Sequence, residues 1–174
     1  MSLPTAKPSN GKPRADWEPR IVAFFCKWCT YTAADVAGVS RMKHAANVRI
    51  IRVMCSGRVD PQFVLEAFAK GADGVLNGGC HFGDCHYSEG NYKAARRIRM
   101  LRRVLADMGI EADRFRLEWI SAAEGEKVKL VINDMTEKVK ALGPLGMPGQ
   151  FKDFDREMEH LEAAAGVKEV AHAG

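Results

Sequence analysis

Five cysteines lie in the first half of this 174-residue chain, at spacings that suit metal or redox chemistry. The loop GCHFGDCHY at residues 79–87 places two Cys-His dipeptides around a glycine, and the motif CKWC at 26–29 spaces two more thiols by two residues. The five are Cys26, Cys29, Cys55, Cys80 and Cys85. An odd number of cysteines in a chain without an apolar leader argues against a disulfide framework and for metal or redox use.

Three kinds of site compete for these thiols. Zinc takes four thiolates in a closed tetrahedron, which the CKWC pair and the Cys80–Cys85 pair would supply. A thioredoxin-like dithiol needs only Cys26 and Cys29. An iron–sulfur cluster also takes four thiolates, and it favours a glycine-bearing loop whose backbone N–H groups reach the sulfurs. Every alternative leaves at least one thiol over, so the count of cysteines does not decide between them.

The composition limits the class of protein. The chain is 47% hydrophobic and 28% charged, which is typical of a globular domain, and its net charge of +4 is too mild to indicate nucleic acid as a partner. Its apolar runs are too short to span a bilayer, so we expect a cytoplasmic protein. The first strand-like run is not followed by Gly-x-Gly-x-x-Gly, and no Ser-His-Asp set is evident, so neither a dinucleotide nor acyl transfer is indicated.

The elements that must position the cysteines alternate along the chain. Apolar runs predict strands at 21–26, 48–55, 73–80 and 114–121. Helix-period segments follow them at 33–43, 60–71, 91–108 and 122–142, with Asp60 as the N-cap, Pro61 at the first helical position and Gly71 at the end of the second helix. This order predicts an α/β fold, flavodoxin-like or doubly wound, in which a parallel sheet of about four strands carries helices on both faces.

The cysteines follow the ends of these strands. Cys26, Cys55 and Cys80 each stand at the carboxyl end of a predicted strand, and Cys29 and Cys85 follow within the same loops. In a parallel sheet these ends lie at one edge, where doubly wound folds bind ligands. We therefore expect the five thiols to converge there.

Four runs of the sequence resemble a known family. They are CKWCTYTAADVAGVSR, VRIIRVMCSGRVDPQFVLEAFAKGADGVL, GCHFGDCHYSEGN and LEWISAAEGEKV, within residues 20–144. They are similar to the delta subunit family of methyl-viologen-reducing hydrogenase. The resemblance implies a [2Fe–2S] protein that catalyses nothing alone and carries electrons from a hydrogenase or formate dehydrogenase to the FAD-containing subunit of heterodisulfide reductase. A zinc-stabilised adaptor and a CxxC dithiol oxidoreductase are the alternatives.

The resemblance matches all five cysteines and does not say which four bind iron. Cys80 and Cys85 lie on a glycine-bearing loop, and Cys26 and Cys55 open loops that lead into helices, where N–H groups favour thiolate. We therefore expect these four as ligands and Cys29 as the spare thiol, with Cys29 possible in place of Cys55 or Cys26. The neighbouring His81 and His86 are expected to form hydrogen bonds instead of binding iron.

Three segments are expected: an extension at 1–19, the iron–sulfur domain at 20–145, and a linker with an amphipathic helix at 146–174. The helix at 91–108 is strongly basic, which indicates a solvated face or docking to an acidic protein surface. Its cations are Lys93, Arg96, Arg97, Arg99, Arg102 and Arg103. Nucleic acid binding ranks last, because no aromatic platform or nucleic-acid motif accompanies the helix.

The last segment generates a first testable prediction. Phe151, Phe154, Met158 and Leu161 recur at the spacing of one helix face, and a helix this short needs its apolar stripe buried to be stable. If that stripe binds a partner protein, deleting residues 148–174 weakens co-purification with the redox partner and leaves the cluster spectrum intact. Full co-purification together with a markedly lower melting temperature would instead place the helix on its own domain.

Overall fold

A computed structural model describes residues 17–147 and 156–161. Strands and helices alternate through the first of these ranges, as the sequence predicts. The strands are β1 (Ile21–Cys26), β2 (Val48–Val53), β3 (Gly74–Gly79) and β4 (Phe115–Trp119). The helices are α1 (Thr30–Val39), α2 (Pro61–Ala69), α3 (Gly90–Asp107) and α4 (Gly125–Leu142), with short 3₁₀ turns η1 (Ser56–Arg58) and η2 (Ala112–Arg114).

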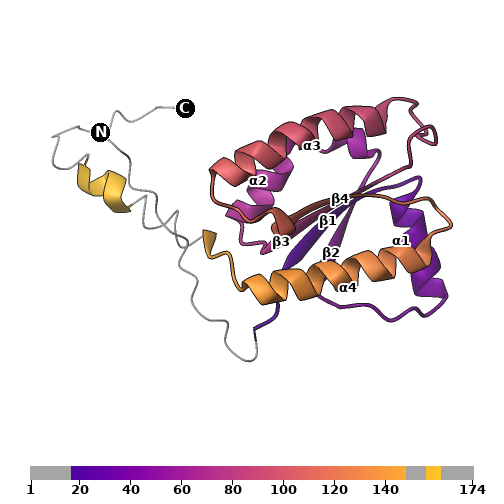
Figure 1. Cartoon of the computed structure of the whole chain (residues 1–174), viewed down its shortest axis with the longest axis horizontal. Helices are drawn as coiled ribbons and strands as arrows, with labels where there is room; N and C mark the ends of the chain where they lie inside the picture. Colours follow the sequence, from indigo (N-terminus) through magenta and orange to yellow (C-terminus); the bar gives the residue numbers. More distant parts are fainter. Residues whose placement is uncertain (1–16, 148–155, 162–174) are drawn as a thin grey trace, which may run out of the picture.

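The four strands form one parallel sheet in the order β2-β1-β3-β4. Figure 1 shows α2 and α3 on one face of this sheet and α1 and α4 on the other. The predicted fold is thereby confirmed. The chain leaves β1 through α1 on one face and leaves β3 through α3 on the opposite face, although β1 and β3 are neighbours. Their carboxyl ends are therefore the switch point at which doubly wound folds bind ligands.

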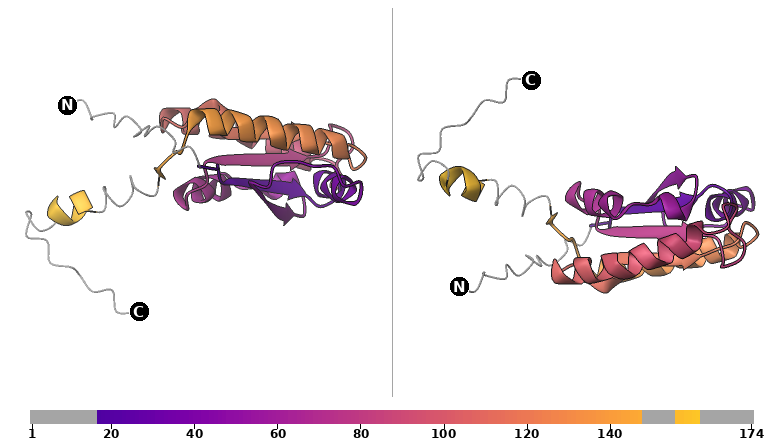
Figure 2. Two further views of the ribbon diagram at one scale, coloured as in Figure 1. Left: turned by 90° about the horizontal axis from the view of Figure 1, so that it is seen from below. Right: turned by 90° about the horizontal axis from the view of Figure 1, so that it is seen from above.

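A separate apolar cluster fills each face of the sheet, and Figure 2 shows the two helical layers from below and from above. Phe24 and Val75 point towards α2 and α3, where they meet Phe68 and Leu101. β3 is buried along its whole length because it has a strand on each side and helices above and below.

Helical cover is incomplete at β2, which is one of the two edge strands of the sheet. Ile50 and Ile51 are 36% and 47% exposed, and a groove of about 680 Å³ runs between β2, β1 and α2. The groove is lined partly by Phe24, Ile51 and Phe63, and it contains no cysteine. Its position sets it apart from the strand ends at which chemistry is expected.

The helix boundaries follow the predicted signals at α2 and differ at α1. Asp60 Oδ1 accepts a hydrogen bond from the N–H of Gln62 (3.0 Å), Pro61 opens α2, and Gly71 follows it with φ +94°. α1 begins at Thr30, three residues before the predicted start, and Cys29 is its N-cap residue. Cys29 therefore lies at the helix N-terminus.

The ends of the chain are described only in part. Trp17 packs against the cluster under α1 and α4, and Glu18 accepts a hydrogen bond from Asn47 Nδ2. Residues 156–161 are helical, with Met158 and Leu161 exposed. Phe151 and Phe154 lie outside the described residues, so the predicted burial of the apolar stripe stays a prediction.

A buried polar pair fixes the amino-terminal edge of the sheet. Arg114 is fully buried, and its guanidinium donates to Glu111 Oε2 (2.6 Å) and to the backbone oxygen of Asp73 (3.1 Å). The carboxylate of Asp73 accepts from the N–H groups of Arg20 (2.9 Å) and Leu145 (3.1 Å). Asp73 thereby ties the start of β1 and the segment after α4 to the start of β3.

Replacing that carboxylate should destabilise the domain without altering the site. Asp73→Ala leaves two backbone N–H groups without their acceptor, at roughly 1–3 kcal/mol each, so we expect a loss of about 2–6 kcal/mol in the free energy of unfolding. Urea denaturation measures this loss. Asp113→Ala, at an exposed carboxylate, is the matched control and should change stability by less than about 0.5 kcal/mol. An equal loss in the two variants would contradict the assigned role of Asp73.

Candidate metal centre

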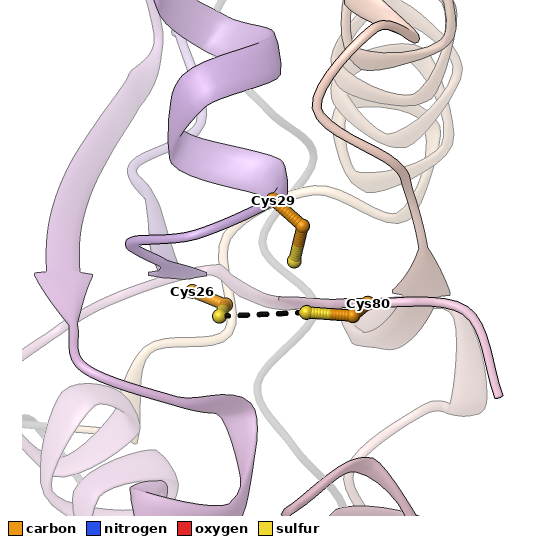
Figure 3. A group of neighbouring side chains, drawn as sticks. All are labelled: Cys26, Cys29 and Cys80. Carbon is orange, nitrogen blue, oxygen red and sulfur yellow. Dashed lines mark hydrogen bonds between the residues drawn. The ribbon is translucent and has the colours of Figure 1, made fainter. Parts of the chain in front are cut away.

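Three thiols meet at the carboxyl ends of β1 and β3. Cys26 is the last residue of β1, Cys29 precedes α1, and Cys80 directly follows β3. Their sulfurs all lie within 4.8 Å of one another, and Cys26 Sγ is 3.8 Å from Cys80 Sγ (Figure 3). The parallel pairing of Phe25 with Gly78 brings the two strand ends level, so Cys26, the next residue of β1, and Cys80, two residues beyond Gly78, can place their sulfurs close together.

The other two thiols form a second pair. Cys55 Sγ and Cys85 Sγ are 3.8 Å apart, and Cys55 Sγ also accepts a hydrogen bond from the N–H of Gly57 (3.4 Å). Met54, the residue before Cys55, supplies a carbonyl oxygen that lies 3.8 Å from the Cys26 thiol. Because Met54 and Cys55 are consecutive, the two groups of thiols are neighbours at one edge of the sheet. The predicted convergence of the five cysteines is therefore seen as a triad and an adjacent pair.

Hydrogen bonds from α3 hold the GCHFGDCHY loop in place. Asn91 is fully buried and donates from Nδ2 to the backbone oxygens of Cys80 (3.2 Å) and His81 (2.7 Å). Nothing in the spacing of the cysteines points to Asn91. Its position in the first turn of the helix after the loop is the only signal that could have found it.

Glycine permits the close approach of α3 to the second pair. A Cβ atom on Gly90 would lie 2.2 Å from Cys55 Sγ and 3.1 Å from Cys85 Sγ. A Cβ atom on Gly57 would lie 2.6 Å from the backbone oxygen of Gly90, so the two backbones pack directly on each other. On the α3 side of these thiols there is no room for an additional side-chain atom.

The thiols of the triad differ in acidity. The neighbouring thiols of Cys29 and Cys80 hold the pKa of Cys26 down, to about 2. Proximity to Cys26 raises the pKa of Cys29 to about 11, and the pKa of Cys80 is raised for the same reason. One thiolate is therefore stabilised at the centre of the group. Further thiolates in so small a space require a cation to balance their charge.

The two thiols of the Cys55–Cys85 pair also have pKa values shifted in opposite directions. Burial is the largest cause of the raised pKa of Cys55, and the nearby charges of Cys85 and Cys26 add to it. Burial also acts to raise the pKa of Cys85, but hydrogen bonds from the backbone N–H groups of Tyr87 and Asn91 lower it overall. Backbone N–H groups thus favour a thiolate in the second pair.

The two histidines lie outside the thiol group. His81 Nε2 is 2.8 Å from Glu124 Oε2, and His86 stacks on Trp28 with 3.7 Å between ring centroids. Glu124 also accepts from the N–H of Ser121 (2.6 Å), and these two hydrogen bonds, led by that of Ser121, lower its pKa to about 2. No pattern in the sequence indicates Glu124, which precedes α4 and is 43 residues from His81.

The spacing of the thiols fits a metal centre. Two thiolates on one tetrahedral metal ion, each about 2.3 Å from it, lie about 3.8 Å apart. Both the Cys26–Cys80 pair and the Cys55–Cys85 pair have this separation, at 3.8 Å. The donors are all sulfur, which suits zinc or iron–sulfur centres. The cavities of about 680 and 520 Å³ lie against α2 without any cysteine in their lining, so neither of these cavities adjoins the thiols.

Comparison with known proteins agrees with this donor set. The family model described as methyl-viologen-reducing hydrogenase, delta subunit, matches residues 21–143. This chain belongs to that family. The family model spans every element from β1 to α4 and all five cysteines.

Relatives of two kinds are similar to the chain. The D-type iron-sulfur subunit of the F420-non-reducing hydrogenase vhc of Methanococcus voltae is 59% identical over 129 residues, which is 74% of this chain and 90% of that protein. The D-type iron-sulfur subunit of the F420-non-reducing hydrogenase of Archaeoglobus profundus is 54% identical, over 74% of this chain and 94% of its own length. In the part of the chain that the structure describes, none of the helices is long and apolar enough to cross a bilayer.

The other kind of relative is a larger protein. It is the A-type subunit of the ferredoxin/F(420)H(2)-dependent CoB-CoM heterodisulfide reductase of Methanosarcina acetivorans, which is 45% identical over 152 residues. The match covers 87% of this chain and 18% of that protein. A domain similar to this chain is thus one part of that larger polypeptide.

The packing at Gly90 generates a testable prediction. Gly90→Ala forces a methyl group against Cys55 Sγ, so the second thiol pair must move apart, and we expect a loss of roughly 1–3 kcal/mol in stability together with weaker metal binding. Thermal unfolding and metal content per chain measure the two effects. Gly38→Ala in α1 is the matched control, because a Cβ there has no neighbour within 4 Å. Unchanged metal content in Gly90→Ala would show that the pair tolerates displacement.

Proposed function

We propose that this chain binds a [2Fe–2S] cluster through Cys26, Cys55, Cys80 and Cys85 and relays electrons within a hydrogenase–heterodisulfide reductase complex. The observation that carries the proposal is the presence of two adjacent thiol pairs, each with the 3.8 Å separation of two thiolates on one metal ion. A [2Fe–2S] cluster has two irons with two terminal thiolates each. Cys26 and Cys80 would hold one iron, and Cys55 and Cys85 the other.

The bound cluster would supply reversible one-electron chemistry. The protein's own part is ligation, charge balance and exclusion of water. The five thiols are all buried, and backbone N–H groups from Gly57, Tyr87 and Asn91 point at the sulfurs of the second pair. Such N–H groups stabilise the more negative, reduced form and so raise the reduction potential.

Cys29 would be the fifth thiol, which lies next to the Cys26–Cys80 pair and does not bind iron. Its sulfur contacts Thr30 Oγ1 at 3.6 Å, and it lies within 4.8 Å of Cys26 and Cys80. From this position Cys29 would lie close to one iron and influence its environment. Serine substitutions decide whether Cys29 replaces Cys26 or Cys55 as a ligand.

The names of the relatives support the choice of partners. The D-type subunits of F420-non-reducing hydrogenases match this chain over nearly their whole length, which supports a hydrogenase as electron donor. A similar domain occurs inside the A-type subunit of a heterodisulfide reductase. This supports the FAD-containing subunit of a heterodisulfide reductase as the electron acceptor. A formate dehydrogenase is the alternative donor. The complex would operate in the cytoplasm and would be suited to electron bifurcation.

Two other functions fit less of the geometry. A zinc-stabilised adaptor is favoured by the triad alone, since three sulfurs within 4.8 Å suit one metal ion, but it leaves the Cys55–Cys85 pair without a role. A dithiol oxidoreductase requires an accessible nucleophilic sulfur. Cys26 and Cys29 are only 1% and 5% exposed, which denies access to a disulfide substrate.

Metal analysis of cysteine variants tests the proposal. The anaerobically purified chain should contain about two irons and two acid-labile sulfides, and dithionite should produce the electron paramagnetic resonance signal of a reduced [2Fe–2S] cluster. Serine at position 26, 55, 80 or 85 should remove more than about half of the iron, because a hydroxyl is a poor replacement for a thiolate ligand of iron. Cys29→Ser is the matched control and should keep the full iron content.

Three results would contradict the proposal. One zinc per chain with no acid-labile sulfide would favour the adaptor. A full, unperturbed cluster in Cys85→Ser would overturn the ligand set. Loss of the cluster in Cys29→Ser, together with its retention in Cys55→Ser, would place Cys29 among the ligands instead of Cys55.

A further inference from the structure

Exposed aromatic and apolar side chains lie near the buried cysteines along the chain. Each lies within two residues of a cysteine or in the first turn of α3, and each is 40–52% exposed, whereas the cysteines are at most 8% exposed. We call this set the apolar collar. It consists of Trp28, Met54, Phe82, Tyr87 and Tyr92.

The aromatic members of the collar are held by contacts with one another and with their neighbours. Trp28 Nε1 donates to Tyr87 Oη (3.3 Å), and His86 stacks on the same indole. The Phe82 ring lies 4.8 Å from that of Tyr92 and 4.9 Å from that of Trp119. Side chains fixed in this way lose little conformational entropy when a second surface covers them, so the collar is suited to docking. Exposed apolar patches of this kind mark interaction sites on soluble proteins.

A row of cations extends from the collar along α3. The helix buries Ala94, Ile98 and Leu101. Tyr92, Arg96, Arg99 and Arg103 follow one another at intervals of three or four residues, so they share one exposed flank of the helix. The row is about 16 Å long, at 1.5 Å per residue, and it begins at the collar.

The three arginines of this row have no acidic partner in the described part of the chain. Arg96, Arg99 and Arg103 are exposed and form no ion pair or hydrogen bond with any described residue. By contrast Lys93 pairs with Glu89 (3.4 Å), and Arg97 donates to the backbone oxygen of Gly57 (2.6 Å). Three like charges at helical spacing repel one another, and an acidic surface would relieve that repulsion.

We infer that the apolar collar and the arginine row form one docking surface, and that its occupant is the A-type subunit of the heterodisulfide reductase in the same complex. The matching surface of that protein is apolar where it covers the thiols and carries carboxylates along α3. This inference rests on the proposed function, because it assigns the acceptor side of the electron relay to a particular face. Docking over the collar would bring the acceptor close to the site, since four of its five members are within two residues of a cysteine in the sequence.

One observation selects the A-type subunit as the occupant, and a second places its docking surface at the redox site. A domain 45% identical to this chain occurs within the polypeptide of such a protein. In that protein the domain and the rest of the A-type subunit are covalently joined. The collar and the thiols belong to the same loops, so the docking surface is continuous with the redox site. A hydrogenase polypeptide on this surface is the competing occupant, and measuring both affinities distinguishes the two.

Charge reversal tests the arginine row. The variant Arg96→Glu/Arg99→Glu/Arg103→Glu should bind the purified A-type subunit from the same organism at least about tenfold more weakly than the native chain in roughly 50 mM NaCl, mainly through slower association. The difference should shrink to about threefold or less in roughly 500 mM NaCl, because salt screens the charges. Biolayer interferometry under anaerobic conditions measures both rate constants, and iron content and melting temperature verify that the variant is folded and loaded.

Two further variants separate charge from apolar contact. Lys43→Glu/Arg49→Glu/Lys70→Glu has the same change in net charge on exposed cations distant from the cysteines, and its affinity should stay within about twofold of the native value. Phe82→Ser should weaken binding to a similar extent at both salt concentrations, since burial of an aromatic ring is little affected by screening.

Three outcomes would overturn the inference. Unchanged affinity and salt dependence in the α3 variant would show that the row is a solvated face. An equal loss in the Lys43/Arg49/Lys70 variant would show that only net charge matters. Lost affinity for the purified hydrogenase, with affinity for the A-type subunit retained, would show that the surface is assigned to the wrong partner. A native chain without iron would instead contradict the proposed function.

Discussion

The parallel pairing of β1 with β3 is the constraint on which the rest of the structure depends. Their register makes the two strands end at the same level, and the chain then turns to opposite faces of the sheet. At this point of divergence the sulfurs of Cys26 and Cys80 lie 3.8 Å apart. Neither thiol lines one of the large grooves beside α2, so the sheet serves here to fix distances between sulfurs.

Small residues allow the neighbouring elements to approach these strand ends closely. A Cβ on Gly78 would lie 2.4 Å from Thr30 Cγ2, and one on Gly79 would lie 2.7 Å from Ser56 Oγ, so α1 and η1 approach the end of β3 more closely than a larger residue would allow. Gly90 does the same for α3 at the second thiol pair. The absence of side chains at these glycines thus determines how closely the neighbouring elements approach the sulfurs.

The site has a buried part, which contains the five thiols, and an exposed part, which carries the aromatic rings. Inside, five thiols are buried, and a thiolate at Cys26 raises the pKa of the neighbouring Cys29. A bound cation would allow several of these thiols to be deprotonated at once. Outside, exposed aromatic rings on the same loops offer a surface for a partner. A buried redox site on loops that also carry exposed aromatic rings is suited to passing electrons between proteins.

The sequence by itself determined the elements and the edge of the sheet at which the cysteines gather. Apolar runs, caps and glycine stops are local signals, and in a parallel sheet every strand end lies at the same edge, so Cys26, Cys55 and Cys80 could be placed together from the sequence. Only the tertiary structure decided that Cys26 pairs with Cys80 and Cys55 with Cys85, partners that are 54 and 30 residues apart. It also placed Glu124 against His81 and left β2 at the open edge. Strand order, register and the paths of loops set those contacts, and they depend on the packing of the whole chain, which local patterns do not contain.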